Sequence, residues 1–220
     1  MSYTFQFRDV FAQWQFLMAG LGTTLYLATV TMLLGLAIGV TGAAARIYSG
    51  PILRSLVATY VEVIRNTPIL VQLFIVFFGL PGLGLRLDAM TAALISLTIN
   101  LGAYSVEIVR AGLEAIPRTQ IEAGHSLGLS GFQVFRYIIV FPALKLMFPA
   151  LASQFILLML ATSIASQISV PELFHAASII QSRTFRDFEV YTVIAVLYLA
   201  LALFLRGAFA MIYKLAFKQQ

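Results

Sequence analysis

Long apolar stretches without charged residues, separated by short polar segments, dominate this chain. Val10–Ala45 contains no charge over 36 positions, and Leu146–Val170 contains none over 25. A bilayer crossing takes about 20 apolar residues. The pattern therefore predicts five membrane-spanning helices, at Phe16–Ala43, Ser55–Leu80, Ala89–Ala111, Leu146–Val170 and Val190–Phe209.

The first predicted span contains a stripe of small residues. Gly35, Gly39 and Ala43 recur every four positions, which predicts a helix face suited to close packing against another helix. The preceding segment, MSYTFQFRDVF, lacks the basic region and cleavage site of a signal peptide. We therefore expect the first apolar segment to be retained as a membrane span.

The second predicted span is interrupted by polar residues and a proline. Glu62 and Arg65 lie three positions apart, where a structural ion pair is expected. Pro68 disfavours helical geometry at the residue before it, so a kink is expected there.

Composition supports an integral membrane protein. Of the 220 residues, 60% are hydrophobic and only 10% are charged, with a mean hydropathy of +0.94. A soluble fold of this size could not bury that much apolar surface. The net charge of +5 is better explained by membrane topology than by nucleic-acid binding. With no cysteine, disulfides and thiolate metal sites are excluded.

One polar stretch, Glu114–Met147, stands apart from this apolar pattern. Thr119 precedes Glu122 by three residues and Ser130 precedes Gln133 by three, so each pair predicts a capping box at a helix start. Gly128 tolerates a left-handed backbone and is expected to end the first of these helices.

The second helix in this stretch, Phe132–Val140, is expected to end at Pro142. Ala123 and Gly124 leave the first helix with little bulk, so another surface could approach it closely. The stretch is interpreted as a docking element.

The distribution of basic residues predicts the orientation of the chain. With the N-terminus outside and the C-terminus in the cytoplasm, nine basic residues fall on the cytoplasmic side: Arg46, Arg54, Arg110, Arg118, Arg136, Lys145, Arg206, Lys214 and Lys218. Only four fall outside: Arg8, Arg86, Arg183 and Arg186. The positive-inside rule favours this orientation, which places the Glu114–Met147 loop in the cytoplasm.

A short helix is expected on the extracytoplasmic side, at about residues 171–181. Ser169 and Glu172 have the spacing of a capping box, and Leu173, Ala177 and Ile180 give the helix one apolar face.

Enzymatic chemistry within the chain is not indicated. No GxxxxGK[ST] loop is present, so any ATP must be bound by another chain. His125 and His175 lack the carboxylate spacing of a metal site, and no serine lies in a G-x-S-x-G elbow. We therefore predict no catalytic residue and no metal site.

Polar residues inside the spans are the candidates for a transport path or gate. Asn100, Tyr104 and Glu107 share one face of the third span. On the fourth span, Thr162 and Ser163 share a face with Ser166, and Gln167 lies four positions after Ser163. Counted from the ends of the spans, Asn100 and Thr162 both fall near mid-membrane. Two alternatives stay open: the hydroxyls can bond their own helix backbone, and Glu107 can pair with Arg110.

The polar stretch also resembles a known motif. Glu122-Ala123, Gly128, Ile139 and Pro142 resemble the EAA loop of ABC-importer permeases. Flanking residues resemble the permeases for polar amino acids: Tyr60-Val61-Glu62, Arg65 to Pro68, Tyr104 to Arg110, Thr162-Ser163 and Pro171-Glu172-Leu173. The departures are Gly124 and His125 in place of Ala and Arg, Phe141 before the proline, and Leu160 in place of a frequent Lys.

The resemblance implies a single permease domain over residues 1–220, in the bacterial inner membrane. The helix carrying Glu122, Ala123, Gly124, His125 and Gly128 would be the coupling helix of the loop at about 114–147. It further implies a partner ATPase dimer that binds ATP and Mg, a second identical or paralogous permease subunit, an extracytoplasmic binding protein and an amino acid substrate.

Two other classes of membrane protein are alternatives to a permease subunit. A secondary amino acid transporter would also place Glu107 in the membrane, but it would normally need more spans or an inverted repeat. A membrane scaffold would have no use for the polar face at mid-membrane. Dependence of uptake on ATP would distinguish the three.

Overall fold

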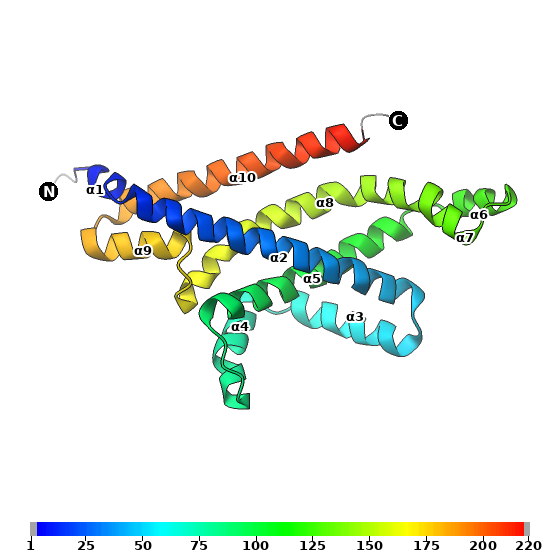
Figure 1. The fold of residues 1–220 in the computed structure, drawn as a ribbon, viewed down its shortest axis with the longest axis horizontal. Coiled ribbons are helices and arrows are strands. Elements are labelled where there is room, and N and C mark those ends of the chain that lie inside the picture. The colour runs from blue at the N-terminus through cyan, green and yellow to red at the C-terminus, as the bar shows by residue number, and fades with distance from the viewer. Residues whose placement is uncertain (1–3, 218–220) are drawn as a thin grey trace.

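The computed structural model describes residues 4–217, and the described chain is helical throughout, without strands (Figure 1). The α-helices are, in chain order, α1 (Arg8–Phe11), α2 (Trp14–Tyr48), α3 (Pro51–Arg65), α4 (Ile69–Phe74), α5 (Ala89–Glu114), α6 (Arg118–Ser126), α7 (Gly131–Val134), α8 (Val140–Ala161), α9 (Leu173–Thr184) and α10 (Asp187–Phe217). Two π-helical segments, η1 (Ile75–Gly79) and η3 (Phe135–Ile139), and two 3₁₀ segments, η2 (Leu80–Leu83) and η4 (Thr162–Ile168), extend or join these helices.

The described residues contain four helical stretches long and apolar enough to cross a membrane: Trp14–Tyr48, Ala89–Glu114, Gly131–Ile168 and Asp187–Phe217. A fifth span is counted if the bent pair Pro51–Arg65 and Ile69–Leu83 is taken as one. The all-α membrane fold expected from the sequence is therefore confirmed, with its second span broken.

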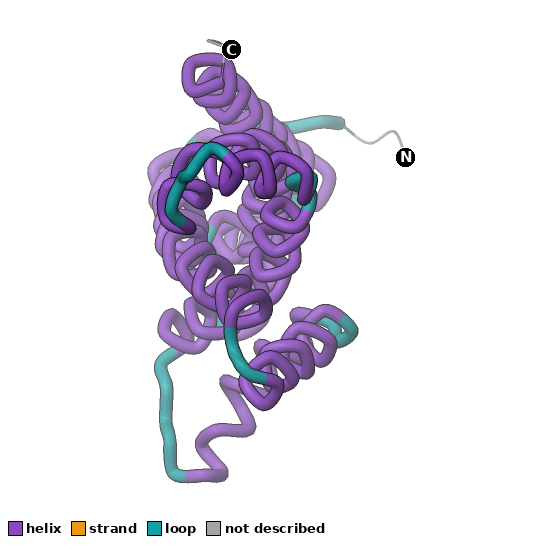
Figure 2. The backbone as a smooth tube through the Cα atoms, turned by 90° about the vertical axis from the view of Figure 1, so that its right-hand side faces the viewer, coloured by secondary structure: helices purple, strands orange, loops and turns teal. Residues whose placement is uncertain are grey.

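The break at Pro68 is sharper than the expected kink. The two halves of the second span differ in direction by 106°. Pro68 has an extended backbone, with ψ at 135°, and immediately precedes α4. Its ring also disfavours helical geometry at the residue before it, Thr67. The segment beginning with α4 consequently turns away from the bundle (Figure 1) and extends below the ring of helices seen end-on (Figure 2).

Close packing of α2 on α5 forms the centre of the bundle. Gly35, Gly39 and Ala43 are all buried, as their spacing predicted. A Cβ added at Gly39 would lie 2.3 Å from Cβ of Ser105, and one at Gly35 would lie within 2.9 Å of Leu101. The small residues thus let the backbones of α2 and α5 approach more closely than larger side chains would allow.

The short helix predicted after the fourth span is present as α9, but its cap is different from the one expected. Ser169 has a left-handed backbone (φ 65°) and does not cap the helix. Glu172 does, because its fully buried carboxylate accepts hydrogen bonds from the backbone N–H groups of Phe174 and His175. Burial raises the pKa of this carboxyl.

The same carboxylate ties α9 to two other helices. The Tyr198 hydroxyl on α10 donates to Glu172 at 2.8 Å, and the Thr24 hydroxyl on α2 lies 3.5 Å away. Thr24 in turn accepts from the backbone N–H of Leu173. α9 is thereby fixed at one end of the bundle, near the N-terminus, whereas α6 and α7 lie at the opposite end (Figure 1). Lys218, counted in the charge asymmetry, lies outside the described residues.

The close approach of α2 and α5 predicts a difference between two substitutions in the same helix. Gly39→Ala places its Cβ against Ser105, whereas Gly22→Ala meets nothing within 4 Å. Overpacking of this kind costs about 1–3 kcal/mol. We expect Gly39→Ala to lower the melting temperature of the purified chain in detergent while Gly22→Ala leaves it unchanged. Equal melting temperatures would contradict the packing described here.

Candidate functional site

The tip of the bundle at the α6–α7 end is shaped by a glycine turn. α6 ends at Ser126, and Gly128 follows with φ +79°, a conformation that suits glycine because it lacks a Cβ. The backbone N–H of Leu129 donates to the carbonyl of Gly124, which closes the helix end in the manner of a Schellman motif. The predicted role of Gly128 at this corner is confirmed.

One of the two expected capping boxes is present. The Ser130 hydroxyl accepts from the Gln133 N–H at 3.4 Å, and the Gln133 side chain accepts from the Ser130 N–H at 2.8 Å. The box at Thr119 is wrong. Helix α6 begins at Arg118, after the extended backbone of Pro117, so the cap position lies two residues before Thr119 and no side chain caps the helix.

The prediction that Pro142 ends the second helix is also wrong. The backbone passes from α7 through the π-helical segment η3 directly into α8, which contains Pro142 in its first turn. Proline has no N–H to donate, and a change of hydrogen-bond register just before it lets the helix continue. The helix after the glycine corner therefore runs without interruption into the fourth span.

Gly124 faces its own chain and not an external partner. A Cβ at this position would lie 2.3 Å from Cδ1 of Ile138 and 3.2 Å from Cγ2 of Val134. This corrects the expectation that both small residues leave room for another protein. Ala123 is exposed, together with Glu122, His125 and Leu127, the last with 81% of its surface accessible. These four residues form the outer face of α6.

A second group of polar residues lies where the broken span meets α5. The Gln72 side chain donates to the carbonyls of Ile64 at 2.8 Å and Thr67 at 3.0 Å, two backbone acceptors at the break. Its own oxygen accepts from the Asn100 amide at 3.0 Å. Asn100 therefore supports the residue that satisfies the break. Gln72 was not singled out from the sequence, although it is a polar residue four positions after Pro68 in an apolar run.

Tyr104, one turn along α5 from Asn100, carries the guanidinium of Arg65 over its ring at 5.2 Å from the ring centroid. The expected ion pair between Glu62 and Arg65 is not formed. Glu62 instead accepts from the Asn66 side-chain amide, because α3 ends at Arg65 and Asn66 follows as its C-terminal cap residue. Ending the helix there frees Arg65 to lie over Tyr104.

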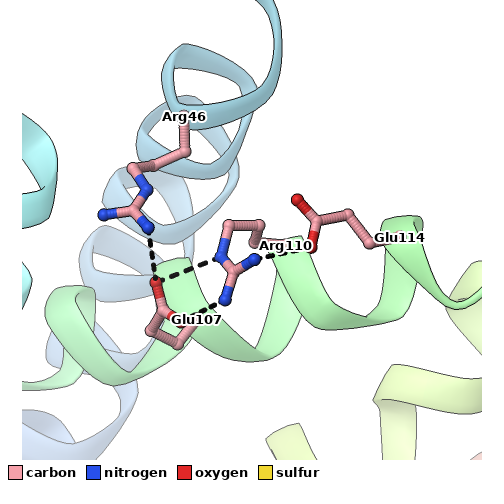
Figure 3. Close-up of polar contacts among 4 residues, drawn as sticks. All are labelled: Arg46, Glu107, Arg110 and Glu114. Carbon is pink, nitrogen blue, oxygen red and sulfur yellow. Dashed lines mark hydrogen bonds and ion pairs between the residues drawn. The ribbon is translucent and has the colours of Figure 1, made fainter. Parts of the chain in front are cut away.

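Glu107 lies at the centre of a charged cluster (Figure 3). Its carboxylate accepts from Arg110 at 2.7 Å and lies 3.9 Å from Arg46 on α2. Arg110 also contacts Glu114 at 2.5 Å. Glu107 and Arg110 are both partly buried, whereas Glu114 is about half exposed. The cluster joins the end of α2 to the end of α5, near the tip that carries α6. The contact between Glu107 and Arg46 was not predicted from the sequence.

The hydroxyls at the end of the fourth span bond their own backbone. Thr162 is buried and donates to the Met159 carbonyl at 2.7 Å, and Ser163 donates to the Leu160 carbonyl at 2.8 Å. The segment is a 3₁₀ helix, η4, in which such bonds to the third preceding residue are natural. Gln167 is exposed and reaches only Ser166.

The described residues contain no group of three or more His, Asp or Glu side chains able to hold a metal ion. The polar positions thus form three sites on the bundle: the outer face of α6, the face of α5 that carries Asn100, Tyr104 and Glu107, and the hydroxyls of η4. The arrangement offers hydrogen bonds and both signs of charge, which suits the binding and passage of a small polar molecule.

A protein family described as "Binding-protein-dependent transport system inner membrane component" matches residues 32–216 of the chain. The chain is 39% identical over 188 residues to the probable glutamine ABC transporter permease protein GlnP of Bacillus subtilis (strain 168), covering 84% of this chain and 86% of that protein. It is 38% identical over 191 residues to the glutamine transport system permease protein GlnP of Escherichia coli (strain K12), covering 86% and 87%.

Solved structures show the same fold. A chain from the crystal structure of an amino acid ABC transporter with histidines superposes with a TM-score of 0.90 at 34% identity, covering 96% of this chain and 99% of that one. A chain of the MetNI methionine ABC transporter in an inward-facing conformation superposes at 0.76 with 21% identity, covering 93% and 98%, which shows the fold alone.

The contact of Gly124 with Ile138 predicts a compensating pair of substitutions. Gly124→Val should displace α6 from α7 and η3, because even its Cβ would overlap Ile138. Ile138→Ala removes the overlapping atoms, so the double variant should regain much of the stability lost. Limited proteolysis of the loop measures the effect. Additive losses in the double variant would contradict this packing.

Proposed function

Because the chain belongs to the family of binding-protein-dependent transport system inner membrane components, we propose that it is the transmembrane subunit of an ATP-driven importer of polar amino acids. The observation that carries the proposal is the separation of two sites on one bundle. An exposed short helix, closed by a glycine turn, lies at one tip, and a polar face lies within the third span. A transport subunit driven by another chain needs both.

The outer face of α6 is the proposed contact with the ATPase. Glu122, Ala123 and His125 lie exposed on a short helix whose direction is set by Gly124 on its inner side and by Gly128 at its end. Because α6 is anchored on α7 and η3, a push on α6 is transmitted to the continuous helix that becomes the fourth span.

The partners follow from this role. Two copies of an ATPase would bind ATP and Mg, and this chain would bind neither. A second permease subunit, identical or paralogous, would complete the path, and an extracytoplasmic binding protein would deliver the amino acid near α9. Leu160, in place of the family's frequent Lys, favours a paralogous partner that supplies the cation. The N-terminus would lie outside and the C-terminus in the cytoplasm, as the basic residues favour.

The proposed path follows the polar face of α5. A free amino acid carries an ammonium and a carboxylate, so its path must offer hydrogen bonds and charges of both signs. Asn100 and Tyr104 offer hydrogen bonds, and Arg65, held over Tyr104, adds a cation. Ser163 and Gln167 on η4 would line the path beyond them, whereas Thr162 is fully buried and would support η4 from behind. Polar groups of this kind are costly against lipid and belong on a water-filled or protein-covered surface.

Glu107 is assigned to a gate at the cytoplasmic end of this path. Its contacts with Arg46 and Arg110 join α2 to α5, so opening the path there would require the contact between the two helices to change. ATP binding would draw the docked loops together, and rigid-body motion of the helices would switch access from one side to the other.

The function is tested by reconstituting the complete transporter in sealed proteoliposomes. Uptake of a polar amino acid should require the binding protein and enclosed ATP, and it should persist when ionophores collapse all ion gradients. Uptake driven by an ion gradient without ATP would instead identify a secondary transporter. Absence of uptake under all conditions would favour a scaffold.

A substitution at the glycine corner tests the coupling. Gly128→Asp places a side chain on a left-handed backbone and adds a negative charge at the contact. We expect the chain to insert normally while uptake is lost and less ATPase co-purifies with it. Gly84→Asp, which follows η2 with φ +85° and has nothing within 4 Å of an added Cβ, is the matched control. Wild-type uptake by Gly128→Asp would rule out the proposed contact.

Removing the charge of Glu107 tests the gate. Glu107→Gln keeps the size of the side chain but weakens both contacts with arginine. Uptake should fall at least tenfold, an effect of roughly 1.4 kcal/mol, while assembly and ATP hydrolysis are retained. Glu114→Gln, at the exposed end of the same cluster, should change uptake little because exposed ion pairs contribute little. If Glu107→Gln lowers assembly and thermal stability but the complex that forms transports normally, Glu107 is purely structural.

A further inference from the structure

A stripe of aromatic residues joins α8 to α10. On α8 the stripe repeats every seven positions, at Phe141, Phe148 and Phe155. On α10 it consists of Phe209, Tyr213 and Phe217. Ring centroids lie 5.4–6.2 Å apart across the two helices. The stripe holds α10 against α8, and three of its members, Phe148, Phe209 and Tyr213, line a groove between the two helices.

This groove has a volume of about 720 Å³ and is lined mainly by apolar side chains. Its walls include Ile156 and Leu157 from α8 and Leu199 and Leu203 from α10. Ala152 and Ala202, one from each helix, leave its centre open. An elongated apolar groove between two membrane helices fits the shape and chemistry of an acyl chain.

Arg206 is the charged residue that lines this groove. It lies within the fifth span and is exposed, and it forms no ion pair or hydrogen bond with another described residue. At 1.5 Å per residue it is about 24 Å along the axis from Val190, in a hydrocarbon core about 30 Å thick. An arginine at that depth must extend to an anionic group or to the membrane interface.

Two lysines add positive charge near the same end of the groove. Lys145 lies one turn before Pro149 on α8, and Pro149 lines the groove, so helical spacing places Lys145 at its extension. Lys214 lies two turns beyond Arg206 on α10. With the proposed orientation, this end faces the cytoplasmic leaflet, where anionic headgroups attract clusters of basic residues.

The groove lies on the α10 side of the bundle, which is opposite the side of α3 and α4 (Figure 1). Asn100 contacts Gln72 on α4, so this part of the proposed path lies on the other side of the bundle. Only 22% of the apolar window of the fifth span is buried within the described chain, so its apolar surface is open to lipid.

We propose that the groove between α8 and α10 binds one anionic phospholipid of the cytoplasmic leaflet, with its phosphate at Arg206 and an acyl chain along the apolar lining. The apolar walls supply contact area, and Arg206 supplies the charge that selects the headgroup. The leaflet follows from the orientation under the proposed function, whereas lipid binding itself does not depend on which substrate is transported.

Native mass spectrometry of the assembled transporter, stripped of lipid and then supplied with defined lipids, tests the proposal. The wild type should retain one phosphatidylglycerol per permease chain and bind phosphatidylcholine about tenfold more weakly. Arg206→Gln should lose that preference, and Arg206→Lys should keep most of it. Arg86→Gln, an exposed arginine far from the groove, is the control and should bind as the wild type does. Equal retention of both lipids, or no effect of Arg206→Gln, would overturn the proposal.

A second measurement asks what occupies the groove. Ala202→Phe fills its centre without changing charge and should abolish the retained lipid. Because the chain has no cysteine, a fluorophore at Ser153→Cys reports on the groove alone. Lipids brominated on their acyl chains should quench it in the assembled transporter. Absence of quenching together with cross-linking from this position to the second permease subunit would assign the groove to a protein interface and overturn lipid binding.

Discussion

Hydrocarbon offers no partner for a free backbone N–H or C=O group, and this constraint governs how the bundle can be interrupted. The most severe interruption is the 106° break between α3 and α4. It is tolerated because Gln72 donates to the carbonyls of Ile64 and Thr67, and Asn100 on α5 holds Gln72 in place. A residue proposed to line the path thus also maintains the break. The polar face of α5 and the bend of the second span are one structure.

The same need to satisfy backbone N–H and C=O groups also determines how the short helices at the two ends of the bundle are held. The buried carboxylate of Glu172 satisfies the first N–H groups of α9 and contacts Thr24 and Tyr198, so the helix nearest the proposed binding protein is fixed to α2 and α10. At the opposite tip, Gly128 closes α6 with backbone hydrogen bonds alone. Both ends of the bundle therefore present short, well-anchored helices, as expected of surfaces that receive or transmit force.

Features set by local chemistry could be predicted from the sequence, whereas those set by contacts between helices could not. The glycine stripe on α2, the Ser130 cap and the left-handed Gly128 follow from residue type and spacing. The three-residue spacing of Glu62 and Arg65 predicts an ion pair within one helix, and this prediction is wrong. The contact of Arg65 with Tyr104 depends on where α3 ends relative to α5. Likewise, the small size of Gly124 predicts room for a partner protein. The structure instead places Ile138, from η3, against Gly124, and this contact between two helices is not visible in the sequence.

The outer face of α6 is proposed to transmit the action of an ATPase to the bundle. Because this chain has no cysteine, a photoreactive group can be attached at Ala123→Cys alone when the purified chain is labelled before assembly with its partners. Cross-linking to each partner is then measured in the assembled transporter. We expect efficient cross-linking from Ala123→Cys to the ATPase and loss of uptake once the link has formed. The control variant Gly82→Cys should give no cross-link to the ATPase. Cross-linking at Ala123 only to lipid or to the second permease subunit, with uptake intact, would contradict the proposed role of α6.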